Sequence, residues 1–372
     1  MAGITPIVMP KWGLSMEKGT VTEWLVAEGT RIEVGMAILE VETDKIAKAV
    51  EAPDPGTLRR IVANAGELLP VKALLGVMAE PEVSEGDIDA YVAAYVTPVV
   101  DEEGEESDAS PGMQRIDIGD ITIRYARRGK ADGIPVLFIH GFGGDLDNWL
   151  FNIDALAEQS PVIALDLPGH GQSTIRLPGT SMAALADFVV SFMNALGVPQ
   201  AHIVGHSMGG AIAAQMALDR PERVASLALI ASAGLGDEIN GGYTDGFVSA
   251  SSRKDLKPVL EQLFSDPSLV SRQIVDDVLK YKRLDGVTEL LATLSGALFG
   301  GGRQLEKPGL RLAETGKRVL VLWGREDRVV PVEHSTHAPA GAMVQVFDHA
   351  GHMVQMERAS DVNRLLAAHV AG

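Results

Sequence analysis

The chain has 372 residues, of which 46% are hydrophobic and 22% are charged, and its formal net charge is −18. This length and composition are typical of two globular domains, and the negative charge argues against binding to nucleic acid or to anionic membrane surfaces. The sequence contains no cysteine, which excludes disulfides, thiolate metal sites and a cysteine nucleophile. The lack of cysteine favours a cytoplasmic location. Neither a signal peptide nor an apolar membrane span is predicted.

The first 80 residues predict a small all-β barrel or sandwich. Short runs of apolar or alternating residues are separated by glycine and proline, and none of them has a convincing helical period. The predicted strands comprise residues 4–9, 19–27, 37–42, 46–51 and 56–62.

A short helix and an acidic segment follow this β-rich domain. Within residues 85–96, apolar side chains recur at helical spacing, which predicts an amphipathic helix that packs on a neighbouring domain or caps the linker. Residues 97–112 are rich in acids, serine, proline and glycine, and we expect them to form a flexible linker. Residues 81–114 are therefore predicted to join two domains.

Residues 115–372 predict an α/β domain with a mostly parallel eight-stranded sheet. Two alternating strands come first, and continuous apolar strands then alternate with helical segments, as in sheets that are covered on both faces. The strands are expected at 115–118, 121–127, 135–140, 162–166, 202–205, 226–231, 318–323 and 343–347, and the helices at 181–196, 208–220 and 356–370.

The strand rhythm stops between the sixth and seventh strands, at residues 234–316. Helical patterns there cover residues 256–264, 268–280 and 287–298. We expect this insertion, called the lid below, to cover an active site.

A nucleophile motif lies between a predicted strand and a predicted helix. Residues 205–209 read GHSMG, which fits G-x-S-x-G with Ser207 as the nucleophile. A serine on such a tight turn has a strained backbone, and side chains at Gly205 and Gly209 would collide with the neighbouring chain. Ser207 also needs a base to remove its proton.

The base is expected downstream of the serine, in the loop after the last strand. His352 is our candidate, because Gly351 before it would let the loop turn back toward the sheet edge. His349 is the alternative base, and either histidine could instead be an ordinary residue of a surface loop.

The acid that orients the base is expected in the turn after the seventh strand. Asp327 is the candidate, and the adjacent Glu326 would then point elsewhere. The segment after the sixth strand has no carboxylate, which favours Asp327. The alternative is a surface acid that pairs with Arg325 or Arg328.

Two backbone N–H groups are expected to form an oxyanion hole. One belongs to Met208 and the other to Phe142, in the HGFGG loop after the third strand. His140, at the end of that strand, is expected to be structural. Asp166 and His170 belong to another glycine-rich loop. One Asp and one His are too few ligands for a metal site, so we expect no metal.

These motifs carry two resemblances. Residues 115–372 resemble the α/β-hydrolase superfamily, with HGFGG, D-x-P-G-x-G, GHSMGG, GREDRVVP and GH in family order. Residues 1–80 resemble the biotinyl/lipoyl carrier fold through MPKWG, EKGTV, WLVAEG and VETDKI. The tetrapeptide ETDK marks lipoylation, so this resemblance implies lipoate covalently bound at Lys45, on a turn between two strands.

The combination resembles the acetyltransferase components of acetoin dehydrogenase complexes, in which an α/β-hydrolase replaces the usual acetyltransferase core. The D-H-x-x-x-D-G motif of that usual core and the peripheral-subunit-binding domain are missing from this sequence. The resemblance implies transfer of an acetyl group from the arm on Lys45 to coenzyme A through Ser207, His352 and Asp327.

The implied partners are thiamine-diphosphate-dependent acetoin dehydrogenase subunits, dihydrolipoyl dehydrogenase and a lipoate ligase, within a multienzyme complex. Two alternatives stay open: a lipoyl-tethered thioesterase or esterase with water as acceptor, and a non-catalytic docking scaffold. On the lid, Arg253, Lys254 and Lys257 either meet the phosphates of coenzyme A or form a solvated face.

Overall fold

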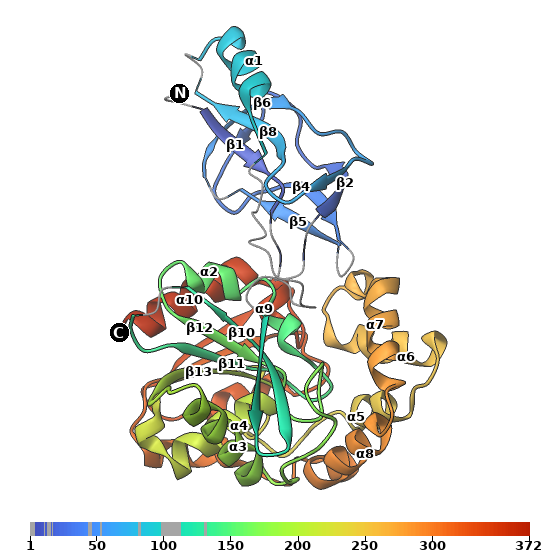
Figure 1. Ribbon diagram of the computed structural model, residues 1–372, viewed down its shortest axis with the longest axis vertical. Helices are drawn as coiled ribbons and strands as arrows, with labels where there is room; N and C mark the ends of the chain where they lie inside the picture. Colours follow the sequence, from blue (N-terminus) through green and yellow to red (C-terminus); the bar gives the residue numbers. More distant parts are fainter. Residues whose placement is uncertain are drawn as a thin grey trace. The chain divides into compact units, whose positions relative to one another are not determined.

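The computed structural model describes residues 4–10, 12, 16, 18–43, 47–52, 54–80, 83–97, 113–129 and 132–372. The chain divides into two compact units, Met1–Pro111 and Gly112–Gly372 (Figure 1). Within the described ranges, no helix is long and apolar enough to cross a membrane.

The first unit consists of two four-stranded antiparallel sheets, in the orders β1-β8-β6-β3 and β5-β4-β2-β7. Val21, Leu39 and Leu58 are among the fully buried residues of its core. The predicted all-β fold is confirmed, although β3, β7 and β8 were not expected. The strands are β1 (Ile4–Val8), β2 (Lys18–Trp24), β3 (Arg31–Ile32), β4 (Ala37–Glu42), β5 (Ala47–Glu51), β6 (Gly56–Ile61), β7 (Leu68–Pro70) and β8 (Leu74–Ala79).

The strands β4 and β5 form an antiparallel pair whose terminal partners are Glu42 and Ala47. The predicted carrier residue Lys45 falls between these two positions but lies outside the described residues. The described strands thus bracket its position in the sequence.

Helix α1 (Glu85–Ala94) packs on the β-rich domain that precedes it, one of the two roles expected for it. Ser84 caps it by accepting a hydrogen bond from the Asp87 N–H. Ile88, its buried residue, lies in one hydrophobic cluster with Leu74 and Val77 of β8. The helix therefore covers one apolar face of the small barrel.

The second unit contains an eight-stranded sheet in the order β16-β15-β14-β13-β11-β12-β10-β9. β10 pairs antiparallel with β9 and β12, and the other pairings are parallel, as predicted. The strands are β9 (Met113–Ile118), β10 (Ile121–Arg128), β11 (Val136–Ile139), β12 (Val162–Leu165), β13 (Ala201–His206), β14 (Val224–Ile230), β15 (Val319–Gly324) and β16 (Met343–Phe347).

Helices cover both faces of this sheet (Figure 1). α2 and α10 lie on one face, and α3 and α4 lie on the other. Because both faces are covered, β11, β12 and β15 are buried along their whole length. The helices are α2 (Ile153–Ala157), α3 (Met182–Ala195), α4 (Met208–Asp219), α9 (Val354–Glu357) and α10 (Ala359–Ala371).

The insertion between β14 and β15 is helical, as predicted. It contains four α-helices in the described chain: α5 (Gly241–Ser249), α6 (Arg253–Leu260), α7 (Arg272–Lys282) and α8 (Val287–Leu298). Figure 1 shows them together at one side of the sheet. α5 was not predicted, and α6 begins before the expected residue 256.

Candidate active site

Ser207 occupies a strained turn between β13 and α4. Its φ is 52° and its ψ is −119°, a conformation that non-glycine residues rarely adopt. A Cβ added at Gly205 would overlap the backbone of Gly209, and one at Gly209 would overlap the carbonyl of Ile139. The turn therefore has room for hydrogen atoms alone at both glycines, as the motif predicted.

His352 and Asp327 lie in direct contact. His352 Nδ1 is 2.8 Å from Asp327 Oδ2, and the two side chains are 2% and 0% exposed. The other carboxylate oxygen of Asp327 accepts the N–H groups of Val329 and Val330 at 2.8 and 2.9 Å. A carboxylate oxygen only accepts, so Nδ1 carries the proton and Nε2 keeps its lone pair for a proton donor.

The two competing residues have other positions. His349 is exposed on the turn, where its φ is 57°. Glu326 makes a different contact: its Oε2 accepts the Ala350 N–H at 3.0 Å. Arg325 pairs with Asp348.

A close backbone contact requires glycine at position 351. The positive φ of this loop is at His349, whereas Gly351 is not among the residues with positive φ. A Cβ at Gly351 would lie 2.7 Å from the backbone nitrogen of Ser265 and 2.9 Å from the carbonyl oxygen of Leu263. Glycine is needed there because the lid packs against the loop.

The two predicted oxyanion donors flank Ser207. Met208 follows it at the first residue of α4, and a Cβ at Gly141, beside Phe142, would lie 3.0 Å from Ser207 Cβ. Among the described residues, neither the Phe142 N–H nor the Met208 N–H donates to another protein group. Both amides therefore remain candidates for the predicted oxyanion hole.

His140 and His170 are buried and neutral. His140 Nδ1 donates to the Gly141 carbonyl at 2.8 Å, while its Nε2 accepts the Leu167 N–H at 2.9 Å. Burial lowers the pKa of His140 to about 4 and that of His170 to about 3. With both nitrogens engaged, His140 orders the loop, as expected of a structural residue.

Asp166 also serves the structure. It is fully buried, lies 3.1 Å from Arg124, and accepts the N–H groups of Leu146 and Gln172 at 2.8 Å each. Its oxygens are therefore occupied by protein donors. In the described chain, no group of three or more His, Asp or Glu side chains is arranged to hold a metal.

Two residues beside His352 escaped prediction from the sequence. His206 Nε2 donates to the His352 carbonyl at 3.0 Å, and burial lowers the pKa of His206 well below its usual value. Glu357 accepts the Gly351 N–H at 2.7 Å and the Ser265 N–H at 2.8 Å. His206 could have been noted as part of GHSMG, but no local pattern marks Glu357.

An aromatic cluster of the lid covers the loop of residues 140–144, called the oxyanion loop below. The rings of Phe247 and Phe299 lie edge-to-face with Phe142, at centroid distances of 5.8 and 5.9 Å. Phe247 is 2% exposed, and its ring approaches Gly143 closely. The lid thus supplies an apolar cover beside the two candidate oxyanion donors.

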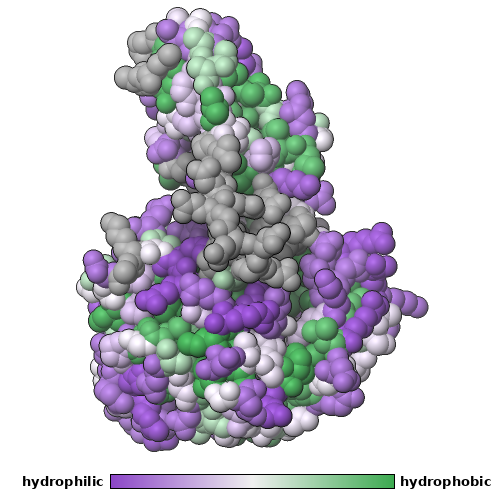
Figure 2. Space-filling view, viewed as in Figure 1, coloured by the Kyte–Doolittle hydropathy of each residue, from purple (hydrophilic) through white to green (hydrophobic). Residues whose placement is uncertain are grey.

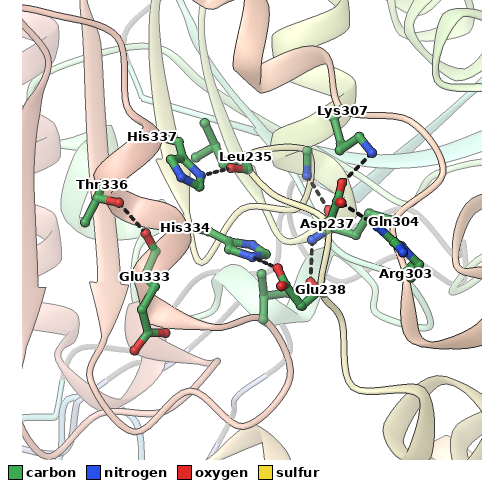
Figure 3. Close-up of polar contacts among 12 residues, drawn as sticks. Leu235, Asp237, Glu238, Arg303, Gln304, Lys307, Glu333, His334, Thr336 and His337 are labelled. Carbon is green, nitrogen blue, oxygen red and sulfur yellow. Dashed lines mark hydrogen bonds and ion pairs between the residues drawn. The ribbon is translucent and has the colours of Figure 1, made fainter.

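The two ends of the lid are fastened to each other (Figure 3). Asp237, near the first end, pairs with Arg303 at 2.6 Å and with Lys307 at 2.5 Å near the second end. Gln304 is 2% exposed; its Oε1 accepts the Gly234 N–H at 2.6 Å, and its Nε2 donates to the Glu238 carbonyl at 2.8 Å.

A histidine outside the lid joins the same cluster. His334 Nε2 lies 2.9 Å from Glu238 Oε2, and the neighbouring His337 donates through Nδ1 to the Leu235 carbonyl at 2.7 Å (Figure 3). The His334 side chain is 3% exposed. The base of the lid is therefore tied to the hydrolase unit as well as to itself.

The outer surface of α6 and α7 is mainly hydrophilic (Figure 2). Arg253 pairs with Asp276, and Lys257 lies 3.6 Å from Glu261; both basic side chains are exposed, and their acidic partners are half-buried. Exposed pairs of this kind contribute little to stability.

Comparison with known proteins agrees with this architecture. A family model described as alpha/beta hydrolase fold matches residues 134–359, and a biotin/lipoyl model described as biotin-requiring enzyme matches residues 5–78. The chain is 63% identical over 369 residues to the dihydrolipoyllysine-residue acetyltransferase component of the acetoin cleaving system of Cupriavidus necator, covering 99% of this chain and 98% of that protein.

A protein of the same description from Pseudomonas putida is 48% identical and is matched over 99% of both chains. Among solved structures, a meta-cleavage product hydrolase from Pseudomonas fluorescens IP01 is 28% identical, with a TM-score of 0.61. That likeness covers 67% of this chain and 94% of the solved chain.

Proposed function

We propose a mechanism on one premise: the chain belongs to the family of dihydrolipoyllysine-residue acetyltransferase components of acetoin cleaving systems. It is a dihydrolipoyllysine-residue acetyltransferase and works as one component of a multienzyme system. The proposal concerns the acceptor of the acetyl group and the residues that transfer it.

In the first half-reaction, Ser207 Oγ attacks the carbonyl carbon of the donor thioester while His352 Nε2 takes its proton. The N–H groups of Met208 and Phe142 stabilise the oxyanion. The carbon–sulfur bond then breaks, the sulfur takes the proton from His352, and the acetyl group stays on Ser207. Asp327 keeps the imidazole in the required tautomer and stabilises its cation.

In the second half-reaction, the thiol of coenzyme A gives its proton to His352, and its sulfur attacks the acetyl-serine. The bond between carbon and Ser207 Oγ breaks, Oγ regains the proton, and acetyl-CoA leaves. The same two amides stabilise the second oxyanion, because it forms at the same carbonyl oxygen.

The donor is proposed to be carried at Lys45. The match to the biotin/lipoyl family covers this position, and the paired residues Glu42 and Ala47 bracket it, which fits an attachment point between two strands. Lipoate, once amide-linked there, would supply the dithiol that holds the acetyl group as a thioester. The chain itself contains no thiol.

The partners proposed are thiamine-diphosphate-dependent acetoin dehydrogenase subunits, dihydrolipoyl dehydrogenase and a lipoate ligase. We also propose a cytoplasmic location, where coenzyme A would be available as acceptor. Arg253, Lys254 and Lys257 remain candidates for its phosphates, although Arg253 and Lys257 already have acidic partners.

The observation that supports the mechanism best is the buried 2.8 Å contact between His352 Nδ1 and Asp327 Oδ2. Ser207 adds to it with a φ of 52°, and its neighbour His206 donates to the His352 carbonyl. The test is Ser207→Ala in the reconstituted complex, with acetyl-CoA formation as readout. We expect a loss of more than about 1,000-fold. Ser191→Ala is the matched control, because this exposed hydroxyl donates to the Asp187 carbonyl of its own helix, far along the chain from Ser207. Unchanged acetyl transfer by Ser207→Ala would overturn the mechanism.

The second candidate is hydrolysis, since the hydrolase family match covers the same residues. Products should be followed with and without coenzyme A, on protein whose intact mass shows the adduct at Lys45. Acetyl-CoA that appears with coenzyme A supports the transferase. Free acetate at equal rates in both cases supports the thioesterase.

A further inference from the structure

One carboxylate joins the lid to the loop that carries His352. Glu357 Oε1 accepts the N–H of Ser265 at 2.8 Å, and Glu357 Oε2 accepts the N–H of Gly351 at 2.7 Å. Ser265 belongs to the lid, and Gly351 precedes His352. A single side chain from α9 therefore bridges two segments that are far apart in the sequence.

The two bridged segments also touch through their backbones. The Met353 N–H donates to the Leu263 carbonyl at 3.0 Å. A Cβ at Gly351 would lie 2.7 Å from the nitrogen of Ser265 and 2.8 Å from the carbonyl carbon of Phe264. The lid segment 263–265 thus packs on the histidine loop without space for a side chain.

The chemistry of this bridge requires a carboxylate. Burial raises the pKa of Glu357, and the hydrogen bonds from Gly351 and Ser265 oppose that shift. Both oxygens of a carboxylate accept, so the side chain serves two N–H donors at once. The isosteric glutamine would direct an NH₂ group at one of these donors and would lose that bond.

We propose that Glu357 is a positioning residue for the acyl transfer. Its hydrogen bonds to Gly351, Ser265 and Asp266 hold the lid segment 263–266 and the loop of His352 as one body. His352 therefore keeps its orientation toward Ser207 while other parts of the lid admit the acyl donor and acceptor. This inference rests on the proposed role of His352, and the experiment below separates the two.

The test compares Glu357→Gln with Glu326→Gln in the full-length protein. Glu326 accepts a neighbouring N–H, that of Ala350, but belongs to the turn after β15. Hydrogen–deuterium exchange should show faster exchange at the Ser265 amide in Glu357→Gln and no change in Glu326→Gln. Labelling of Ser207 by a fluorophosphonate should slow by about 10- to 100-fold in Glu357→Gln.

Steady-state kinetics with free S-acetyl-dihydrolipoamide separate positioning from binding. We expect kcat to fall with the labelling rate in Glu357→Gln and KM to stay within about twofold. The melting temperature of each variant, measured by circular dichroism, must remain above the assay temperature. The opposite result would be a variant whose Ser265 amide exchanges faster but whose labelling rate and kcat equal those of the wild type. Glu357 would then have only a structural role, and the proposal would be overturned.

A second variant removes the same bond from the lid side. Ser265→Pro deletes both the N–H and the side-chain hydroxyl that bond to Glu357. Phe264 before it has ψ 148°, which a following proline tolerates. Its labelling rate should fall like that of Glu357→Gln, and the double variant should be no slower than either single one. Fully additive losses would contradict a shared bridge. If wild-type Ser207 is not labelled at all, the proposed function fails, while the exchange comparison still tests the bridge.

Discussion

Phe247 of the lid lies so close to Gly143 of the oxyanion loop that a methyl group added at Gly143 would overlap its ring. Gly143 also has φ 70°, where a side chain is strained. We predict that Gly143→Ala displaces the Phe142 amide, costs about 1–3 kcal/mol of unfolding free energy, and slows fluorophosphonate labelling of Ser207.

The control for this substitution is Gly296→Ala. Gly296 lies inside α8, and an added Cβ there meets no atom within 4 Å. Alanine should stabilise the helix by about 0.5–1 kcal/mol, measured by urea unfolding. Normal labelling in Gly143→Ala would show that the glycine is not needed for the site.

Asp327→Asn tests the tautomer of His352. The amide oxygen can still accept the N–H groups of Val329 and Val330, but the NH₂ group would face Nδ1 and favour the wrong tautomer. We expect acetyl transfer to fall by about 10⁴-fold with little change in the melting temperature.

Asp348→Asn is the matched control for Asp327→Asn, because Asp348 is exposed and pairs with Arg325. Its activity should stay within about twofold of wild type, since exposed ion pairs contribute at most about 1 kcal/mol. Equal losses in the two variants would mean that the buried contact has no special role.

The buried histidines predict a pH dependence of stability. The folded-state pKa of His140 is lowered to about 4 from an ordinary 6.5, so the unfolded chain binds a proton that the folded chain excludes. The stability is fully present above pH 6.5 and is lost as the pH falls toward 4. The expected loss is about 1.4 kcal/mol per pH unit, or roughly 3 kcal/mol in total.

Urea unfolding of wild type and His140→Gln at several pH values measures this contribution. In the variant, the free energy of unfolding should change less steeply with pH between 4 and 6.5, by the equivalent of about one bound proton. An identical slope would assign the acid sensitivity to other groups, such as His170 or His206, whose pKa values burial also lowers.

Gln304 is predicted to stabilise the attachment of the lid to the rest of the hydrolase unit, and its loss should lower the free energy of unfolding. Gln304→Ala removes two buried hydrogen bonds and leaves the Gly234 N–H without its partner, which should cost about 2–4 kcal/mol. Gln345→Ala, at an exposed side chain that bonds to the Val346 carbonyl, should change stability by less than about 0.5 kcal/mol. Similar unfolding free energies for the two variants would contradict this role.

The sequence could predict those features that depend on local chemistry. The strand, the turn and the helix around Ser207 follow from apolar runs separated by small residues, and the glycines at 205 and 209 are required because neighbouring backbone leaves no space. The position of Asp327 after one strand and of His352 after the next brings them to the same edge of a parallel sheet.

Features that depend on distant contacts were not predictable. Helix α5 contains Gly241, Gly242 and Gly246, which disfavour a helix, but Asn240 caps it and Phe247 is buried against the oxyanion loop. Likewise, Glu357 reaches a donor 92 residues earlier in the chain. Tertiary packing decides such positions, and no local spacing records it.

The ends of the lid meet in space, with consequences for protein engineering. Glu238 and Arg303 form an isolated β-bridge, and the Ile239 N–H donates to the Gly302 carbonyl at 3.1 Å. The first and last residues of the segment 239–302 are therefore adjacent in space. A lid taken from another hydrolase could be grafted at this junction without stretching the sheet, provided that it brings a backbone donor for Glu357.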